Sequence, residues 1–270
     1  MFHARVKTGA ALVIAVCLIL GFSHLPPVLY AAIAFLTVCA VWEMSKAFDS
    51  GFPGVAVGAA ALELVLLLLL PDALLSTIVS WVFLAMLIIF LCAMGRFGSL
   101  KSIPQWFRLL ILFALPLFYA AMQPVRAHSG GVWLLAIAIF LCMITDSFAF
   151  LVGKRFGKHK LAPRISPHKS IEGSIGGTVS AAVLILAAVG LVRLFRDFQV
   201  NWGLLALYLV TGSVISQLGD LSMSVIKRVE GIKDYGKLLP GHGGILDRFD
   251  SLLFVLPYTC LFLDWAGPIF

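Results

Sequence analysis

Charged residues are scarce in this sequence. Asp, Glu, Lys and Arg make up only 12 % of the 270 residues, whereas hydrophobic residues make up 61 % and the mean hydropathy is +1.04. An average soluble domain carries about 25 % charged residues, so a water-soluble globule is excluded. The composition instead predicts a polytopic protein that crosses a lipid bilayer several times.

Two further absences narrow the class of protein. The five cysteines all lie inside apolar runs and show no CxxC spacing, so no disulfide or zinc site is expected and small buried side chains are the simpler interpretation. The first apolar run ends in GFSHLPP at residues 21–27, which contains no small-x-small cleavage pattern. We therefore interpret that run as a membrane span rather than a signal peptide.

Long apolar runs are abundant, and each is long enough to be considered as a membrane-spanning helix. We predict nine of them, at residues 9–22, 28–47, 53–70, 75–94, 105–122, 131–152, 171–194, 202–226 and 252–270. The expected fold is thus an all-α polytopic membrane protein with about nine transmembrane helices. No internal repeat divides it, which argues against the inverted halves of many transporters.

The distribution of basic residues predicts the orientation. With a cytoplasmic N-terminus, nine spans place 17 of the 20 Lys and Arg residues on the cytoplasmic side and leave Arg126, Arg193 and Arg196 outside. The C-terminus is then outside. The net charge of +7 is explained by attraction to anionic lipid head groups, so no nucleic acid partner is expected. We expect a multi-pass protein of the inner (cytoplasmic) membrane.

The charges are concentrated in the second half of the chain. Residues 224–250 hold nine of the 33 charged residues. We therefore predict that residues 1–130 form a scaffold of transmembrane helices and that residues 131–270 carry a catalytic site at the cytoplasmic face. Ionisable groups at a membrane boundary are expected to be functional.

Two carboxylates lie at matching depth in the predicted membrane. Asp146 precedes Lys154 by eight residues, and Asp220 precedes Arg228 by eight residues, on two spans that run in the same direction. At a rise of 1.5 Å per residue, each carboxylate is about 12 Å inside the basic edge. An unpaired carboxylate is costly there, so each needs a cation, a proton or water.

The predicted helix that carries Asp220 continues with Ser224, Lys227 and Arg228 on the same face. The simpler alternative to a functional site is a structural ion pair between Asp and Lys that only cross-links two helices. The loop that follows favours a site, because Pro240 to Gly244 place flexible backbone N–H groups before the next helix, where phosphate binds well. Carboxylates among cations fit a magnesium–polyphosphate substrate, because Mg²⁺ takes one or two carboxylates and completes its shell with phosphate oxygens and water.

A second charged segment spans residues 153–177. Its first part is equally well explained as a solvated loop facing lipid head groups. Its second part, Ser166 to Gly173, is predicted to open a helix with a hydroxyl, a cation and a carboxylate together. Gly173 and Gly177 form a GxxxG pattern, which predicts close packing against another helix.

Together these motifs resemble the phosphatidate cytidylyltransferase (CDP-diacylglycerol synthase) family. The C-terminal signature of that family matches the following residues without departure: Ser224, Lys227, Arg228, Lys233, Asp234, Pro240, His242, Gly243, Gly244, Asp247, Arg248 and Asp250. Asp146, the FGK at 156–158, the segment 166–177 and the QxGD at 217–220 also resemble family motifs. The resemblance covers about the last 125 residues, and the first five spans match only in hydropathy.

The resemblance implies transfer of a cytidylyl group from CTP to phosphatidate, giving CDP-diacylglycerol and pyrophosphate. We expect Asp220 and Asp247 to hold Mg²⁺, with Asp146 or Asp250 at a second cation. Substrate contacts are expected from these residues: Lys227, Arg228 and Arg248 on the triphosphate; Ser166, Lys169 and Glu172 on the head group or cytidine; and Gly173, Ser224, Lys233, Asp234, His242, Gly243 and Gly244 around them. His242 is interpreted as ordering the loop or bonding a phosphate rather than as an acid.

Other functions remain open at this stage. A CTP-dependent polyprenol kinase would share the nucleotide, the metal and the membrane, but would release CDP. An ion-coupled transporter would use Asp146 and Asp220 as coupling sites, against which stands the gathering of charge at one face. A CDP-alcohol phosphotransferase is disfavoured because its DGxxAR start is absent. The oligomeric state is also open, with a homodimer as one arrangement.

Overall fold

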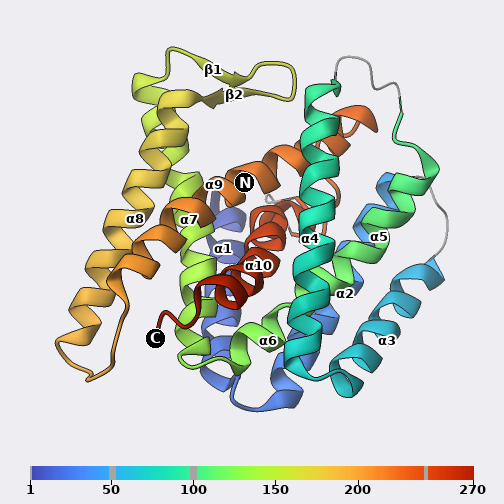
Figure 1. Ribbon diagram of the computed structural model, residues 1–270. Helices are drawn as coiled ribbons and strands as arrows, with labels where there is room; N and C mark the ends of the chain where they lie inside the picture. The colour runs from blue at the N-terminus through green and yellow to red at the C-terminus, as the bar shows by residue number, and fades with distance from the viewer. Residues whose placement is uncertain (1, 49–52, 98–101, 240–242) are drawn as a thin grey trace.

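The computed structural model describes residues 2–48, 53–97, 102–239 and 243–270, which form a bundle of helices with one small β-hairpin (Figure 1). The helices are α1 (Phe2–Phe22), α2 (Pro26–Ala47), α3 (Pro53–Leu69), α4 (Asp72–Gly95), α5 (Gln105–Ala120), α6 (Met122–Ala127), α7 (Gly131–Phe156), α8 (Ile171–Arg193), α9 (Trp202–Val229) and α10 (Leu246–Ala266). The hairpin strands are β1 (Lys160–Ala162) and β2 (Ser166–Ser170).

By length and composition, seven helical segments of the described chain qualify as membrane spans. They are Pro26–Ala47, Asp72–Gly95, Gln105–Ala127, Gly131–Phe156, Ile171–Arg193, Trp202–Val229 and Leu246–Ala266. Gly9–Phe22 and Val57–Leu69 are shorter apolar helices at two further predicted positions. The chain is therefore a multi-pass helical membrane protein, while the count of nine and the orientation of the termini stay predictions.

Helix ends follow local chemistry. The Ser170 side chain accepts a hydrogen bond from the Gly173 backbone N–H at 3.1 Å and caps α8, and Asn201 caps α9 through the Leu204 N–H at the same distance. Each cap satisfies a backbone donor that has no partner within its helix. α10 ends at Gly267, whose φ of 84° is accessible to glycine at little cost.

α10 lies in the middle of the bundle (Figure 1) and contacts α2, α4, α5, α6, α7 and α9. Its Phe254 ring packs edge to face against Phe83 and Phe90 of α4 and Phe118 of α5, with centroid separations of 6.3, 5.6 and 6.1 Å. Such aromatic pairs contribute roughly 0.5–1.5 kcal/mol each beyond their buried area. Helices from both halves of the chain thus surround the helix that begins with Asp247 and Asp250.

The prediction that residues from Ser166 onward open a helix was wrong. Ser166–Ser170 is strand β2, paired antiparallel with β1, and the helix begins only at Ile171. The helix starts later because Ser170 is its N-cap: Ser170 is extended, its side chain accepts from the Gly173 N–H, and Ser166–Ser170 pairs with β1. The all-α class therefore needs one correction, a two-stranded hairpin at one end of the bundle (Figure 1).

The predicted close packing at Gly173 and Gly177 is confirmed. A β-carbon at Gly173 would lie 2.5 Å from the Ala149 carbonyl oxygen, and one at Gly177 would lie 2.6 Å from that of Thr145. Both carbonyls belong to α7. The two glycines thus bring the backbones of α7 and α8 together at the end nearest the hairpin.

Candidate active site

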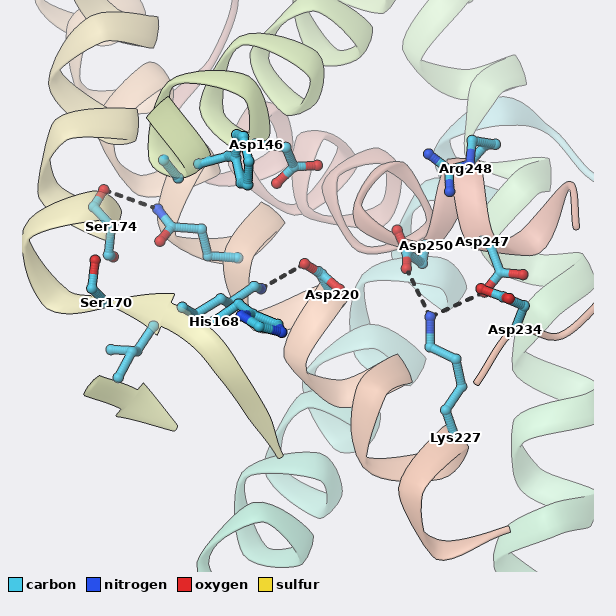
Figure 2. A pocket seen from close by; sticks show the side chains of 15 residues that line it. Asp146, His168, Ser170, Ser174, Asp220, Lys227, Asp234, Asp247, Arg248 and Asp250 are labelled. Atoms are coloured by element: carbon cyan, nitrogen blue, oxygen red, sulfur yellow. Dashed lines mark hydrogen bonds and ion pairs between the residues drawn. The ribbon is translucent and has the colours of Figure 1, made fainter. Parts of the chain in front are cut away.

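A cavity of about 360 Å³ lies at the hairpin end of the bundle, between α7, α8, α9, α10 and β2 (Figure 2). Its described lining consists of Asp146, Ala149, Phe150, Leu161, His168, Lys169, Ser170, Ser174, Gln217, Asp220, Lys227, Asp234, Asp247, Arg248 and Asp250. Residues from two charged segments that lie far apart in the sequence therefore meet in one place.

Asp220 is paired with a lysine from the hairpin. The Lys169 ammonium lies 2.6 Å from Asp220 Oδ2, an ion pair without the angle of a directed hydrogen bond, and each side chain is 25 % exposed. Ser224, one turn further along α9, donates to Asp220 Oδ1 at 3.4 Å. The strand β2 thus supplies the countercharge for a carboxylate that sits inside the bundle.

Lys227 provides the second pairing. Its ammonium donates to Asp247 Oδ1 at 3.0 Å and lies 3.8 Å from Asp250 Oδ2, so it points between two carboxylates at the start of α10 (Figure 2). The three side chains are 12, 2 and 10 % exposed. Buried charges of this kind are stable only when paired, and here one cation serves two anions.

Asp247 also fixes the loop before α10. Its Oδ2 accepts hydrogen bonds from the backbone N–H groups of Tyr235 at 2.8 Å and Gly244 at 3.0 Å. The Tyr235 hydroxyl donates to the Met223 carbonyl at 2.8 Å. Burial, and then the nearby Asp250 and Asp247 carboxylates, raise the pKa of Tyr235 well above its ordinary value, so the phenol keeps the proton that it donates.

Asp146 and Asp250 complete the acidic wall of the cavity. Asp146 Oδ2 accepts from the Ser251 hydroxyl at 3.3 Å, and Asp250 Oδ1 accepts from the Ser251 backbone N–H at 2.8 Å. Asp146 and Asp220 both line the cavity, as their matching depth on two helices indicated.

Two residues for which substrate contacts are predicted hold the hairpin. The Glu172 carboxylate accepts from the backbone N–H groups of Lys158 at 3.0 Å and His159 at 3.2 Å, and also contacts the His159 ring at 2.7 Å. Arg228 Nε donates to the Ile165 carbonyl at 3.2 Å. Neither side chain is among the described residues that line the cavity.

The remaining expected residues lie around the cavity rather than in its described lining. They are Ser166 on β2, Gly173 against α7, Ser224 behind Asp220, the exposed Lys233, and Gly243 and Gly244 beside Asp247. Gly243 has a φ of 84°, which explains its residue type. Pro240 and His242 lie outside the described residues.

Five polar residues were missing from the expected site. His168, Ser170, Ser174 and Gln217 line the cavity, and Gln217 Nε2 donates to the Ser174 carbonyl at 3.4 Å. Glu43 of α2 binds the backbone at the start of α10. A polar residue inside an apolar span, such as Gln217 or Glu43, is the signal that identifies candidates of this kind.

The donor set is compatible with a substrate-bound magnesium ion. Within the described ranges, no three His, Cys, Asp or Glu side chains form a ready-made metal cage. The cavity instead presents five carboxylates interleaved with Lys169 and Lys227. Mg²⁺ commonly takes one or two carboxylates and completes its octahedron with phosphate oxygens and water, so such an ion does not require a closed set of protein ligands.

Fold and site define a multi-pass helical membrane protein with a charged cavity at one end of the bundle. The model of the cytidylyltransferase family matches residues 3–266, so the chain belongs to that family, which is one of nucleotidyltransferases. It is 45 % identical over 136 residues to a phosphatidate cytidylyltransferase of Staphylococcus haemolyticus and 48 % over 139 residues to one of Staphylococcus aureus. A third, from Staphylococcus saprophyticus, is 42 % identical over 142 residues. The aligned parts cover 50–53 % of this chain and 51–53 % of each relative, so the chain spans about half the length of the relatives it matches.

Proposed function

We propose that the protein is a phosphatidate cytidylyltransferase of the cytoplasmic membrane, which converts CTP and phosphatidate into CDP-diacylglycerol and pyrophosphate. The observation that carries the proposal is the cavity in which Asp146, Asp220, Asp247 and Asp250 meet Lys169 and Lys227. Family membership and the names of the relatives support the same reaction. The end of a membrane bundle also suits one substrate from water and one from lipid.

The chemistry requires charge neutralisation more than proton transfer. A phosphate oxygen of phosphatidate attacks the α-phosphorus of CTP, and the bond to the oxygen that bridges the α- and β-phosphates breaks. The bond electrons leave with pyrophosphate. Because the attacking oxygen is already anionic near neutral pH, no strong base is needed, and catalysis consists of aligning two anions and offsetting their charge.

Residue roles follow from position. Asp220 and Asp247 would hold Mg²⁺, which offsets phosphate charge when bound, and Asp146 or Asp250 would serve a second cation. Lys227 and Arg248 would bind the triphosphate from α9 and α10, and Lys169 would bind the phosphatidate head group from β2. Glu172 and Arg228 would act indirectly by holding the hairpin that presents Lys169.

The test uses purified full-length protein with CTP, phosphatidate and Mg²⁺ in detergent or vesicles. We expect CDP-diacylglycerol and pyrophosphate in equal amounts, loss of turnover in EDTA, and recovery on adding excess Mg²⁺. Release of CDP from CTP with a polyprenol, without product from phosphatidate, would replace the proposal with a lipid kinase. Turnover that survives thorough chelation would remove Mg²⁺ from the mechanism.

A further inference from the structure

A carboxylate from the first half of the chain caps the helix that carries Asp247. Glu43 of α2 is 7 % exposed, and its two oxygens accept from the backbone N–H groups of Ile245 at 3.1 Å and Leu246 at 2.8 Å. These N–H groups belong to the start of α10, whose own N-cap residue supplies no side-chain bond. Glu43 lies 202 residues before Ile245 in the sequence and therefore caps α10 from another helix. Its carboxylate also places negative charge at the positive end of the helix dipole.

The same carboxylate shapes the loop before α10. At both Gly236 and Gly244, the three atoms nearest to an added β-carbon all belong to Glu43, and the β-carbon would overlap its carboxylate. Neither glycine has a positive φ, so these positions need glycine for space. Gly243 differs, because its φ is 84° and its nearest neighbours are Asp247 and Asp234.

Glu43 and Asp247 hold the loop from opposite sides. Tyr235 and Gly244 donate their backbone N–H groups to Asp247 Oδ2, while the adjoining Gly236 and Ile245 lie against Glu43. Asp247 in turn binds Lys227. A displacement of Glu43 is therefore transmitted through the loop ends to two charged groups of the cavity.

We propose that Glu43 is a positioning residue, which holds the loop ends and the start of α10 so that Asp247 and Lys227 lie correctly for the reaction. The catalytic part of this inference rests on the proposed function, whereas the anchoring of the loop does not. A carboxylate that served only the packing of α2 would neither bind the N-terminus of α10 nor contact the loop before it.

The first test compares Glu43→Gln with Glu63→Gln. Glu63 lies on α3, is 1 % exposed, and makes no contact with the loop that the structure records, so it serves as a matched buried carboxylate. A glutamine side chain in place of Glu43 would retain one acceptor and turn an amide donor toward the other N–H. We expect kcat to fall by about 10–100-fold with both KM values within about threefold, because misalignment acts on the transition state. Glu63→Gln should stay within about threefold of wild type.

A measurement that does not depend on turnover separates the anchoring of the loop by Glu43 from the proposed catalytic function. Lys233 and Lys237 in the loop are exposed, and trypsin cleaves at such sites when the local backbone opens. Glu43→Gln should be cleaved there at least fivefold faster than wild type, and Glu63→Gln should not. If the protein makes no CDP-diacylglycerol but Glu43→Gln is cleaved faster, the result would support the anchoring of the loop by Glu43 and contradict the proposed function. Unchanged cleavage and unchanged kcat in Glu43→Gln would overturn the inference.

Second-site suppression gives a sharper test. Gly236→Ala alone should lower kcat and accelerate cleavage, because the new methyl group meets the Glu43 carboxylate. In the Glu43→Ala background that carboxylate is gone, so adding Gly236→Ala should cause no further loss. Multiplicative losses in the double variant would show that Gly236 and Glu43 act separately, which contradicts the inference.

Discussion

Three carboxylates of the cavity, Asp220, Asp247 and Asp250, are paired with lysines. Lys169 faces Asp220, and Lys227 is shared by Asp247 and Asp250. A carboxylate inside a membrane bundle without such a partner would be unfavourable by several kcal/mol. The pairs keep the site folded and charged, but they also mean that removal of one partner leaves the other uncompensated.

Asp220→Asn and Asp247→Asn should each lower kcat at least ~100-fold, the scale of a lost charge-stabilising group. The two variants should differ in stability. Asp220→Asn leaves Lys169 without its countercharge, and Asp247→Asn weakens the bonds from Tyr235 and Gly244 in addition to the pair with Lys227, so the thermal unfolding midpoint should fall in both and further in Asp247→Asn. Steady-state kinetics and thermal unfolding measure both effects.

The matched control is Asp264→Asn, on α10 but outside the cavity, where the carboxylate accepts from Ser76 and Ser80. Its kcat should remain within about threefold of wild type. Near-normal turnover in Asp220→Asn or Asp247→Asn would exclude that residue as a metal ligand.

Asp146 and Asp220 line one cavity from two helices, so their effects should be coupled. Asp146→Asn should impair kcat nearly as much as Asp220→Asn, and the double variant should lose far less than the product of the single losses. Kinetics of the three variants measure the coupling. If Asp146→Asn lowers stability but leaves kcat per folded molecule within about threefold, Asp146 is structural, and the second cation belongs at Asp250.

The close packing of α7 against α8 depends on glycines, which have no side chain at the contact. Gly177→Ala would bring a methyl group to 2.6 Å from the Thr145 carbonyl and should destabilise the protein by about 1–3 kcal/mol. Gly190→Ala on the same helix meets its nearest atom at 3.8 Å, and should be neutral or stabilising by up to ~1 kcal/mol. Thermal unfolding in one detergent measures both. Equal midpoints would show that α7 and α8 can separate without loss.

The sequence predicted those elements whose properties are set by local spacing. Asp146 and Asp220 were placed in one cavity because helical rise converts residue number into depth. The hairpin was missed because its strands are short and its local signals, Pro163 and Pro167, indicate a turn or an extended residue but no strand pairing. Glu43 is visible in the sequence as a charged residue in an apolar span, but its partner cannot be predicted from the sequence because the contact joins residues 202 positions apart.

For the whole molecule, the orientation in the membrane is the main open prediction. Cysteines at Lys158 and Lys237 should react with impermeant reagents only from the cytoplasmic side, and one at Asp197 only from outside. All three positions are exposed. The background should lack native cysteines, because Cys17 and Cys92 are also exposed. Labelling of Lys158→Cys and Lys237→Cys from opposite faces would contradict the nine-span topology and separate the two segments that line the cavity.

The central position of α10 also bears on synthesis. It is the last described helix in the chain, yet six other helices pack around it. During translation the N-terminal helices emerge first and must enter the bilayer before their common neighbour exists. Until the ribosome has made α10, lipid or an insertion factor must cover their inner faces, and Glu43 has no backbone amides to bind. Closure of the bundle and assembly of the cavity therefore both require α10.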